Sequence, residues 1–296
     1  MIATHPRKSS IAIIGLCAAL LLATGQSHQK TPAKSFKFSS YRQLENLPKL
    51  CDQNTLVIFD VDDTMTTYTD VTQDPRWEPW FEIRAKADHL YTGPDKDKLL
   101  WSMLVRQTHY YLFDPDVIAF IRQLQRKQCM VVALTALHSG RYGVIEDLAA
   151  WRADGLAELG IHFFGQFDDK TFTTLPQNRG TYPCLHHGIL FANGVAKGKV
   201  LEAFLDTYKL QPSRVILFDD STNEHRSIAS ECARRNIPFT GYQVMGAKRS
   251  KIVTAATTTR ELPQISFLTR YARWLQEVKD EYIDTPNAYP RHEKHP

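Results

Sequence analysis

Short apolar runs alternate with amphipathic segments along most of the chain. Three runs of six residues are nearly continuous in apolar side chains, which predicts buried parallel strands at 55–60, 130–135 and 214–219. Shorter runs predict further strands at 161–164, 188–193 and 238–244. Apolar residues at helical spacing predict helices at 115–128, 139–159 (with interruptions), 197–208, 221–235 and 270–282.

This alternation of strands and helices predicts an α/β fold with a parallel sheet. Sheets of this kind bind ligands at the carboxyl ends of their strands, near the point where the strand order reverses. In this chain the three long strands end in Asp60, Thr135 and Asp219. Acids and a hydroxyl therefore stand at the edge of the sheet where a ligand is expected.

The first 25 residues have the pattern of a secretory signal peptide. Arg7 and Lys8 precede an apolar stretch at 11–22, and small residues at positions 23 and 25 suit cleavage after Gly25. The apolar stretch is too short to cross a hydrocarbon core of ~30 Å comfortably, so no membrane span is expected after cleavage. An uncleaved N-terminal anchor is the alternative. We therefore predict an exported protein, periplasmic or secreted.

After the signal, the pattern predicts one large domain at 51–285. Residues 26–50 are polar and rich in Lys and Ser and are expected to be a lead-in, and residues 286–296 are expected to be a tail. Two helical patterns separated by Gly93-Pro94 stand between the first two long strands. They predict a small helical insert at about 68–112.

Composition and charge exclude several classes of protein. The chain is 43% hydrophobic and 23% charged, which is ordinary for a globular protein. The net charge is only +4 and no dense stripe of Lys and Arg occurs, so nucleic-acid binding is not expected.

Cysteines and paired histidines give weaker signals. None of the four cysteines after the signal belongs to a CxxC pair, which argues against zinc-finger or thioredoxin chemistry. Two alternatives remain open for Cys51, Cys129, Cys184 and Cys232. All four are free thiols, or they form two disulfides in one of three possible pairings. His186 and His187 are expected to point to opposite faces of a strand, which argues against a paired metal site.

The candidate chemistry begins with the run from Asp60 to Thr64, directly after the first long strand. Asp60 at the strand end can attack phosphorus and become an aspartyl phosphate. Asp62 can protonate the leaving oxygen and then deprotonate the attacking water. Two acids this close repel each other unless a cation lies between them, and Mg²⁺ fits because it prefers oxygen ligands and neutralises phosphate. The alternative is an acidic turn, because Asp favours turns.

A second acidic strand end strengthens the case for a cation. Asp219 and Asp220 end the third long strand, and two carboxylates there are costly unless they bind a cation or hydrogen-bond donors. We expect Asp60, Asp62 and Asp220 to hold Mg²⁺, and Asp219 to orient the site or to accept backbone hydrogen bonds. Supporting roles are expected for Asn223 and Glu224.

Lys197 and Thr135 complete the candidate site. Lys197 opens a helix and falls on its buried face, so it should point toward the strand ends, where phosphate and Asp60 are expected. Lys199 shares the outer face with Glu202 and is expected to be a surface charge. Thr135 offers a hydroxyl for a phosphate oxygen.

In this order, the motifs resemble those of the haloacid dehalogenase-like hydrolase superfamily. The matching stretches are DVDDT at 60–64, Thr135 in VVALTA, Lys197 in VAKGKVL, and Asp219-Asp220 in VILFDDSTNE. The resemblance covers roughly residues 51–245. More narrowly, the stretch at 188–205 and the VILFDDSTNE run resemble an uncharacterised secreted bacterial branch of that superfamily.

The resemblance implies a Rossmann-like core with Asp60 as nucleophile and Asp62 as general acid and base. It implies that Thr64, Thr135 and Lys197 position the phosphate, and that the backbone near Asp62 joins Asp60, Asp62 and Asp220 in holding Mg²⁺. It also implies that the insert at 68–112 is a cap. Side chains that could contact an organic phosphate there, or pack the insert itself, are Trp77, Trp80, Arg84, Trp101, Arg106, His109 and Tyr110.

The same resemblance makes the strands at 55–60 and 130–135 parallel neighbours. Cys51 and Cys129 would then lie at the amino-terminal edge of the sheet, away from the acids. A disulfide needs Cα atoms within about 7 Å, whereas parallel neighbours lie about 4.8 Å apart. The pair is therefore a candidate disulfide with a structural role.

These observations predict a secreted Mg²⁺-dependent phosphomonoesterase that acts on a small phosphorylated substrate through an aspartyl phosphate. A phosphotransferase on the same site is one alternative, and transfer of phosphate to alcohols would identify it. A non-catalytic secreted binding protein is the other. Loss of Asp60 or Asp62 would have favoured the binding protein, and both are present.

Overall fold

The computed structural model of the protein describes residues 33–68, 98, 101–102, 105–106, 110–163 and 165–245. The predicted signal peptide, the helix expected at 270–282 and the tail lie outside the described residues, as does most of the insert expected at 68–112. Among the described residues, no helix combines the length and the apolar character that crossing a membrane requires.

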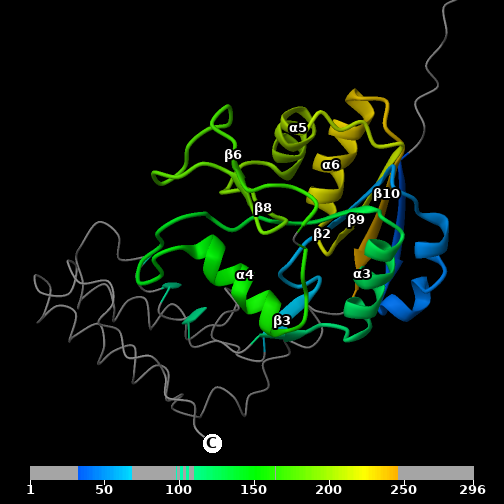
Figure 1. The fold of residues 1–296 in the computed structure, drawn as a ribbon, viewed down its shortest axis with the longest axis horizontal. Coiled ribbons are helices and arrows are strands. Elements are labelled where there is room, and N and C mark those ends of the chain that lie inside the picture. Colours follow the sequence, from blue (N-terminus) through cyan, green and yellow to red (C-terminus); the bar gives the residue numbers. More distant parts are fainter. Residues whose placement is uncertain are drawn as a thin grey trace, which may run out of the picture. The chain divides into compact units, whose positions relative to one another are not determined.

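The central sheet confirms the predicted α/β class. Its parallel strands are β1 (Lys34–Phe38), β2 (Thr55–Phe59), β5 (Met130–Thr135), β8 (Ile189–Phe191), β9 (Arg214–Asp219) and β10 (Phe239–Val244). Two antiparallel strands, β7 (Cys184–His186) and β6 (Lys170–Thr171), continue the sheet beyond β8. The strand order is β1-β10-β9-β2-β5-β8-β7-β6 (Figure 1).

The strand order reverses at β2. From β2 the chain continues through β5 to β8 on one side, whereas β9 and β10 lie on the other side. Such a switch point leaves a crevice at the carboxyl ends of the two central strands. Phe59 of β2 pairs with Phe218 of β9, and the backbone N–H of Asp60 donates to the Phe218 carbonyl over 2.8 Å. The two acidic strand ends therefore lie side by side at this crevice.

Side chains of the parallel strands alternate between two apolar layers. Val57 and Phe59 belong to the layer with α3 (Asp116–Arg126) and α4 (Leu148–Glu158). Leu56 and Ile58 belong to the layer with α5 (Lys197–Thr207) and α6 (Thr222–Arg234). All of β2 is buried, since it has apolar neighbours on both faces, and this explains its continuous apolar run.

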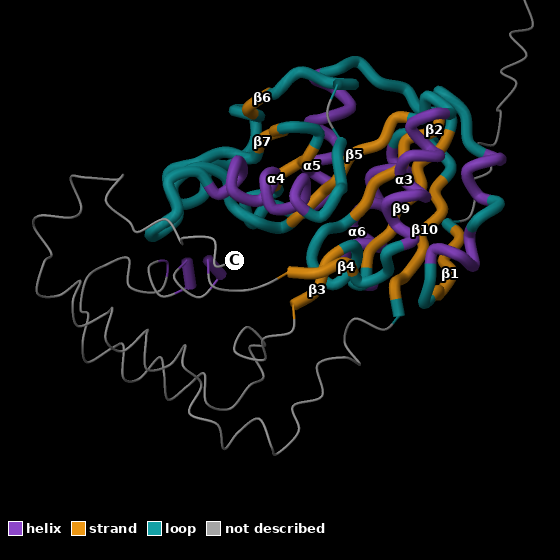
Figure 2. The backbone as a smooth tube through the Cα atoms, turned by 60° about the horizontal axis from the view of Figure 1, so that its bottom comes forward, coloured by secondary structure: helices purple, strands orange, loops and turns teal. Residues whose placement is uncertain are grey.

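A second, two-stranded sheet stands at the base of the expected insert. β3 (Thr66–Tyr68) and β4 (Tyr110–Leu112) pair antiparallel and lie side by side in Figure 2. They lie between β2 and α3 and flank residues 69–109, so the two ends of the expected insert meet at this small sheet.

The structure differs from the sequence pattern in several segments, among them β3, β4 and β6, where no strand was expected. Residues assigned to the lead-in form β1 and two 3₁₀-helices, Tyr41–Leu44 and Leu47–Leu50, and Tyr41 is 1% exposed within the core. Residues 161–163 form no strand, although Ile161 and Phe163 are buried in the core. The helix expected from residue 139 begins only at Leu148, after Gly140 and Gly143 adopt positive φ.

Candidate active site

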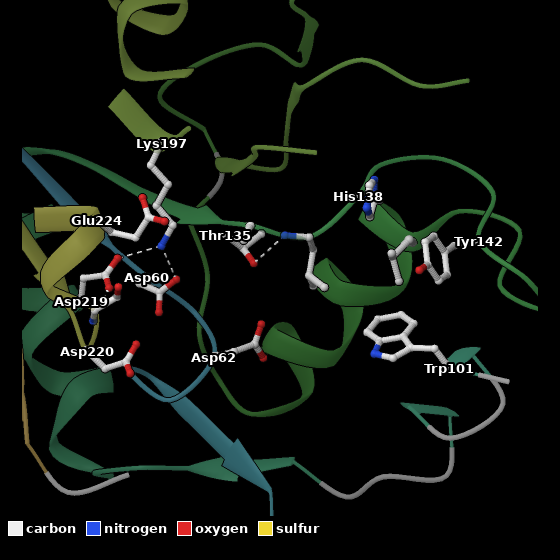
Figure 3. Close-up of a pocket in the computed structure, with 14 residues that line it drawn as sticks. Asp60, Asp62, Trp101, Thr135, His138, Tyr142, Lys197, Asp219, Asp220 and Glu224 are labelled. Carbon is white, nitrogen blue, oxygen red and sulfur yellow. Dashed lines mark hydrogen bonds and ion pairs between the residues drawn. The ribbon is translucent and has the colours of Figure 1, made fainter. Parts of the chain in front are cut away.

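A cavity of about 400 Å³ lies at the carboxyl ends of β2, β5 and β9. One end of it carries carboxylates and Lys197, and the other carries Trp101, His138 and Tyr142 (Figure 3). The structure brings most of the predicted site residues to this cavity. Its lining includes Asp60, Asp62, Thr135, Lys197, Asp219, Asp220 and Glu224.

Lys197 joins the two acidic strand ends. Its Nζ atom lies 2.6 Å from Asp60 Oδ1 and 2.7 Å from Asp219 Oδ2, and the residue is 3% exposed. The predicted pairing with Asp60 is confirmed, because the first turn of α5 aims this side chain along the sheet. Lys199 lies on the outer face of α5 and pairs with Glu202 over 2.8 Å, as the helical spacing predicts.

Burial dominates the electrostatics of this end of the cavity. Burial raises the pKa of Asp60 well above its ordinary value, and Lys197 opposes this effect while Asp219 adds to it. For Lys197, burial alone would lower the pKa, but Asp60 and Asp219 reverse this and raise it. The lysine therefore stays charged, and the buried carboxylates share one ammonium group.

Three carboxylates form a candidate metal centre. Asp60, Asp219 and Asp220 each offer a ligand oxygen, and these atoms lie within 4.8 Å of one another. Asp60 and Asp219 share the single ammonium group of Lys197. A set of hard, anionic oxygen ligands of this kind fits Mg²⁺. Asp219, expected to orient the site or to accept backbone hydrogen bonds, is thus a potential ligand as well. Its Oδ1 atom accepts the Ser221 N–H over 2.8 Å, as expected.

The Asp62 carboxylate takes a different partner. Arg152 NH2 lies 2.5 Å from Asp62 Oδ1 and donates to Thr66 Oγ1 over 2.7 Å. The same guanidinium lies 4.3 Å from the ring centroid of Tyr110. Asp62 therefore stands beside the carboxylate cluster rather than within it, and Arg152 connects it to β3 and β4. The expected metal-ligand role of Asp62 stays a prediction.

The two threonines differ in their surroundings. Thr64 is fully buried; its hydroxyl donates to Asp60 Oδ2 over 3.0 Å and accepts the Asp220 N–H over 3.1 Å. In this arrangement Thr64 positions Asp60, and its predicted contact with phosphate stays a prediction. Thr135 lines the cavity, and its hydroxyl accepts the Leu137 N–H over 3.2 Å.

The supporting residues at the start of α6 also separate. Glu224 lines the cavity. Asn223 is exposed and accepts a hydrogen bond from Arg226. Only Glu224 of this pair therefore stands where it can act on a ligand in the cavity.

His186 and His187 do not point to opposite faces. β7 ends at His186, and His187 has φ 47°, so the two rings stack with centroids 4.1 Å apart. With Asp169 they offer ligand atoms within 4.8 Å. A bound metal lies in the plane of each imidazole, so these stacked rings do not hold one ion in this conformation.

Sequence reasoning did not single out three residues of this site. Arg152 is 2% exposed, but in the sequence it stands between Trp151 and Ala153 in a helical segment and belongs to no motif. His138 and Tyr142 line the cavity from the irregular segment before α4. Trp101 was a candidate, and the structure places it in the lining.

Comparisons with known proteins give a family but no activity. The model of a protein family of unknown function, DUF2608, matches residues 38–278. A protein of Chlamydia trachomatis serovar D named "Putative outer membrane protein" is 26% identical over 202 residues, 67% of this chain and 71% of that protein. An uncharacterized protein of Rickettsia prowazekii (strain Madrid E) is 21% identical over 247 residues, 79% of this chain and 84% of that protein. No solved structure matches the chain.

The family match corrects one prediction. The expected membership in the haloacid dehalogenase-like superfamily is wrong, because the family model that matches describes a different family, one of unknown function. The resemblance rested on a few residues at strand ends. An acid at the carboxyl end of a buried parallel strand suits any α/β protein that binds a ligand there, so such short runs do not identify a family.

Proposed function

The chain belongs to the DUF2608 family of proteins of unknown function, and we propose that it is an exported, Mg²⁺-dependent phosphomonoesterase that acts through an aspartyl phosphate. One observation carries the proposal. Asp60 is paired with Lys197 at the switch point of a parallel sheet, within a cluster of three carboxylates.

The charge of the cluster supports a phosphate ester as the ligand. Asp60 and Asp219 are buried and share one lysine, so their carboxylates disfavour an anion, and phosphate needs a cation in order to bind there. Asp60, Asp219 and Asp220 would hold Mg²⁺. When bound, the ion would neutralise the phosphate and favour the ionised, nucleophilic form of Asp60. Asp60 is thus a buried carboxyl group whose ionisation a bound metal would favour. Titratable groups with such shifted pKa values are typical of catalytic sites.

The residues of the cavity can divide the reaction into two steps. In the first, a carboxylate oxygen of Asp60 attacks phosphorus, the bond from phosphorus to the alcohol oxygen breaks, and Asp62 donates a proton to that oxygen. In the second, Asp62 takes a proton from water, the water oxygen attacks phosphorus, and Asp60 is released with free phosphate. Lys197 and the Thr135 hydroxyl would bind phosphate oxygens throughout.

Two further features belong to the proposal. Export is supported by the signal pattern at 1–25 and by the name of the Chlamydia relative, which describes that protein as an outer membrane protein. A helical insert at about 68–112 that covers the site is supported by Trp101, since this residue of the insert lines the cavity.

The test is a panel of phosphate monoesters assayed with the chain that starts at residue 26. We expect hydrolysis with Mg²⁺, loss of hydrolysis with a chelator, and recovery when Mg²⁺ is restored. Asp60→Asn should abolish turnover, whereas the matched variant Asp206→Asn, on the outer face of α5, should retain it. Phosphate transfer to an added alcohol would identify a phosphotransferase. Absence of any metal-dependent turnover, or full activity of Asp60→Asn, would reject the proposal.

A further inference from the structure

Three rings form a continuous wall at the end of the cavity away from the carboxylates (Figure 3). Trp101 and Tyr142 meet edge to face, with centroids 5.0 Å apart and planes at 75°. Tyr142 and His138 stack, with centroids 5.4 Å apart and planes at 25°. Leu137 and Leu148 add apolar lining. This wall offers flat, apolar surface directly beside the proposed phosphate site.

Polar contacts on the outer side hold the wall in place. Arg179 donates to the Tyr142 hydroxyl over 2.6 Å, and its guanidinium lies 5.5 Å from the centroid of the same ring. The Nδ1 atom of His138 lies 2.5 Å from Asn193 Oδ1. Rings fixed in this way bind a ligand without first being ordered, which reduces the entropic cost of binding.

The contacts of Asn193 determine where the His138 proton lies. Asn193 is fully buried, and its Nδ2 donates to the carbonyls of Thr181 and Asn178 over 2.6 and 3.3 Å. Its Oδ1 is therefore the atom that faces His138, and it accepts the proton on Nδ1. Burial lowers the pKa of His138; the hydrogen bond to Asn193 opposes this effect and Arg179 adds to it. The net shift of the pKa is downward, so the ring is neutral near pH 7. The ring nitrogen left for a ligand, Nε2, is then an acceptor.

These features define the ligand by its chemistry. Aromatic side chains favour stacked and edge-to-face contacts with another planar ring. A neutral histidine whose Nε2 accepts a hydrogen bond favours a ligand that carries a donor, such as a hydroxyl or amino group. A cavity of about 400 Å³ lies toward the small end of the range for ligand sites, so it suits a compact molecule.

We propose that the substrate is a small phosphate monoester whose alcohol portion carries a planar aromatic ring with a hydrogen-bond donor. The ring would bind against Trp101, Tyr142 and His138, with the donor directed to His138 Nε2. This inference rests on the proposed function, because it names the substrate class of the same site. It assigns specificity to residues that the catalytic scheme does not use.

The test compares three esters that each release a primary alcohol and have the same two-carbon chain: 2-phenylethyl phosphate, 2-cyclohexylethyl phosphate and 2-(4-hydroxyphenyl)ethyl phosphate. We expect kcat/KM for the phenyl ester to exceed that for the cyclohexyl ester by about threefold to tenfold, because only the planar ring can stack. The hydroxyl should give a further gain of a few fold through His138.

Substitutions separate the two contributions. Tyr142→Leu should bring the ratio of phenyl to cyclohexyl ester close to one. His138→Phe keeps a ring but removes the acceptor, so it should abolish only the gain from the hydroxyl. Tyr208→Leu, a ring at the far end of α5, is the matched control and should change neither ratio.

A binding experiment keeps this inference separate from the proposed function. Calorimetry with Mg²⁺ present measures the affinities of 3-phenylpropylphosphonate and 3-cyclohexylpropylphosphonate, which cannot be hydrolysed. Equal affinities and equal kcat/KM values would overturn the inference and leave phosphatase activity standing. Tighter binding of the phenyl compound without hydrolysis of any ester would overturn the proposed function and support the ring site. Failure of both measurements overturns both.

Discussion

The two ends of β2, β5 and β9 differ in the groups that they bury. At the carboxyl ends lie Asp60, Asp219 and Lys197, which are 7%, 0% and 3% exposed. At the amino ends, the thiols of Cys51 and Cys129 are buried next to each other. A hydrogen bond between them lowers the pKa of Cys51, although burial opposes this effect. One end buries two carboxyl groups around one ammonium group, whereas the other buries two neighbouring thiols.

This difference indicates which end serves function and which serves stability. Buried carboxylates with too few counter-charges destabilise a fold unless a ligand compensates them. At the amino ends, the buried Thr55 hydroxyl has protein partners of both kinds: it donates to Asp52 over 2.8 Å and accepts from Arg214 over 3.1 Å. Substitutions at the carboxyl ends should therefore affect activity most, and those at the amino ends should affect stability most.

The largest effect on activity is expected for Lys197→Ala. Phosphate and Asp60 then lose their shared cation, and kcat/KM should fall about 10²- to 10³-fold. Lys199→Ala is the matched control on the outer face of the same helix, and its activity should stay within about twofold of the wild type. Steady-state assays on folded protein, checked by circular dichroism, measure both. The reverse ranking would show that the carboxyl end does not carry the chemistry.

Arg152→Met should have the next largest effect. Asp62 loses the guanidinium that holds it in place but keeps its carboxyl group. The value of kcat should therefore fall, but by less than the roughly 10²- to 10⁴-fold that complete loss of general acid–base catalysis costs. The pH profile of kcat should change as well, and Arg152→Lys should recover part of the activity. If thermal stability falls while kcat and its pH profile remain those of the wild type, Arg152 is purely structural.

Asp220→Asn tests the metal centre. The substitution removes one negative charge from the ligand set. The Mg²⁺ concentration that gives half-maximal activation should therefore rise roughly tenfold or more. At saturating Mg²⁺ much of the activity should return. Titration of activity with Mg²⁺ measures this, and Asp206→Asn provides the comparison. An unchanged Mg²⁺ requirement would remove Asp220 from the ligand set.

The amino end should show the smallest effect on activity. Cys51 and Cys129 are free thiols in the structure, and a thiol oxidant of an exporting compartment could join them in a disulfide. Closing this long loop should stabilise the fold by roughly 4 kcal/mol in the chain-entropy model. Reduction should then lower the melting temperature without changing the Mg²⁺ requirement. Peptide mapping of the exported protein without reductant identifies the bond, and alkylation of both thiols before reduction would refute it.

The sequence pattern predicts the centre of the sheet well and its edges poorly. β5 and β9 have the predicted bounds, because strands buried on both faces read as apolar runs. β1 is missed because it is an edge strand in which only Phe38 is buried. The buried residues at 161–163 mimic a strand, since apolar character reports burial rather than backbone pairing.

The candidate site divides in the same way. Lys197 is predictable because helical periodicity fixes the face on which it lies. Arg152 also lies on the buried face of its helix, with Leu148 and Leu156. However, it belongs to no motif that would connect it with its distant partners Asp62 and Thr66. His138 and Tyr142 stand in a segment without regular periodicity, so their common wall depends on loop conformation. Long-range contacts of this kind leave no local signal in one sequence.

The central claim is that Asp60 carries phosphate during turnover, and trapping the phosphorylated protein tests it most directly. Asp62→Asn should slow release of the phosphate, so acid quenching shortly after substrate and Mg²⁺ are added should preserve it. Mass spectrometry should then find one phosphoryl group on the peptide that contains Asp60, and hydroxylamine should remove it. Turnover by the wild type without any phosphorylated intermediate in either protein, or phosphate on another residue, would contradict the account.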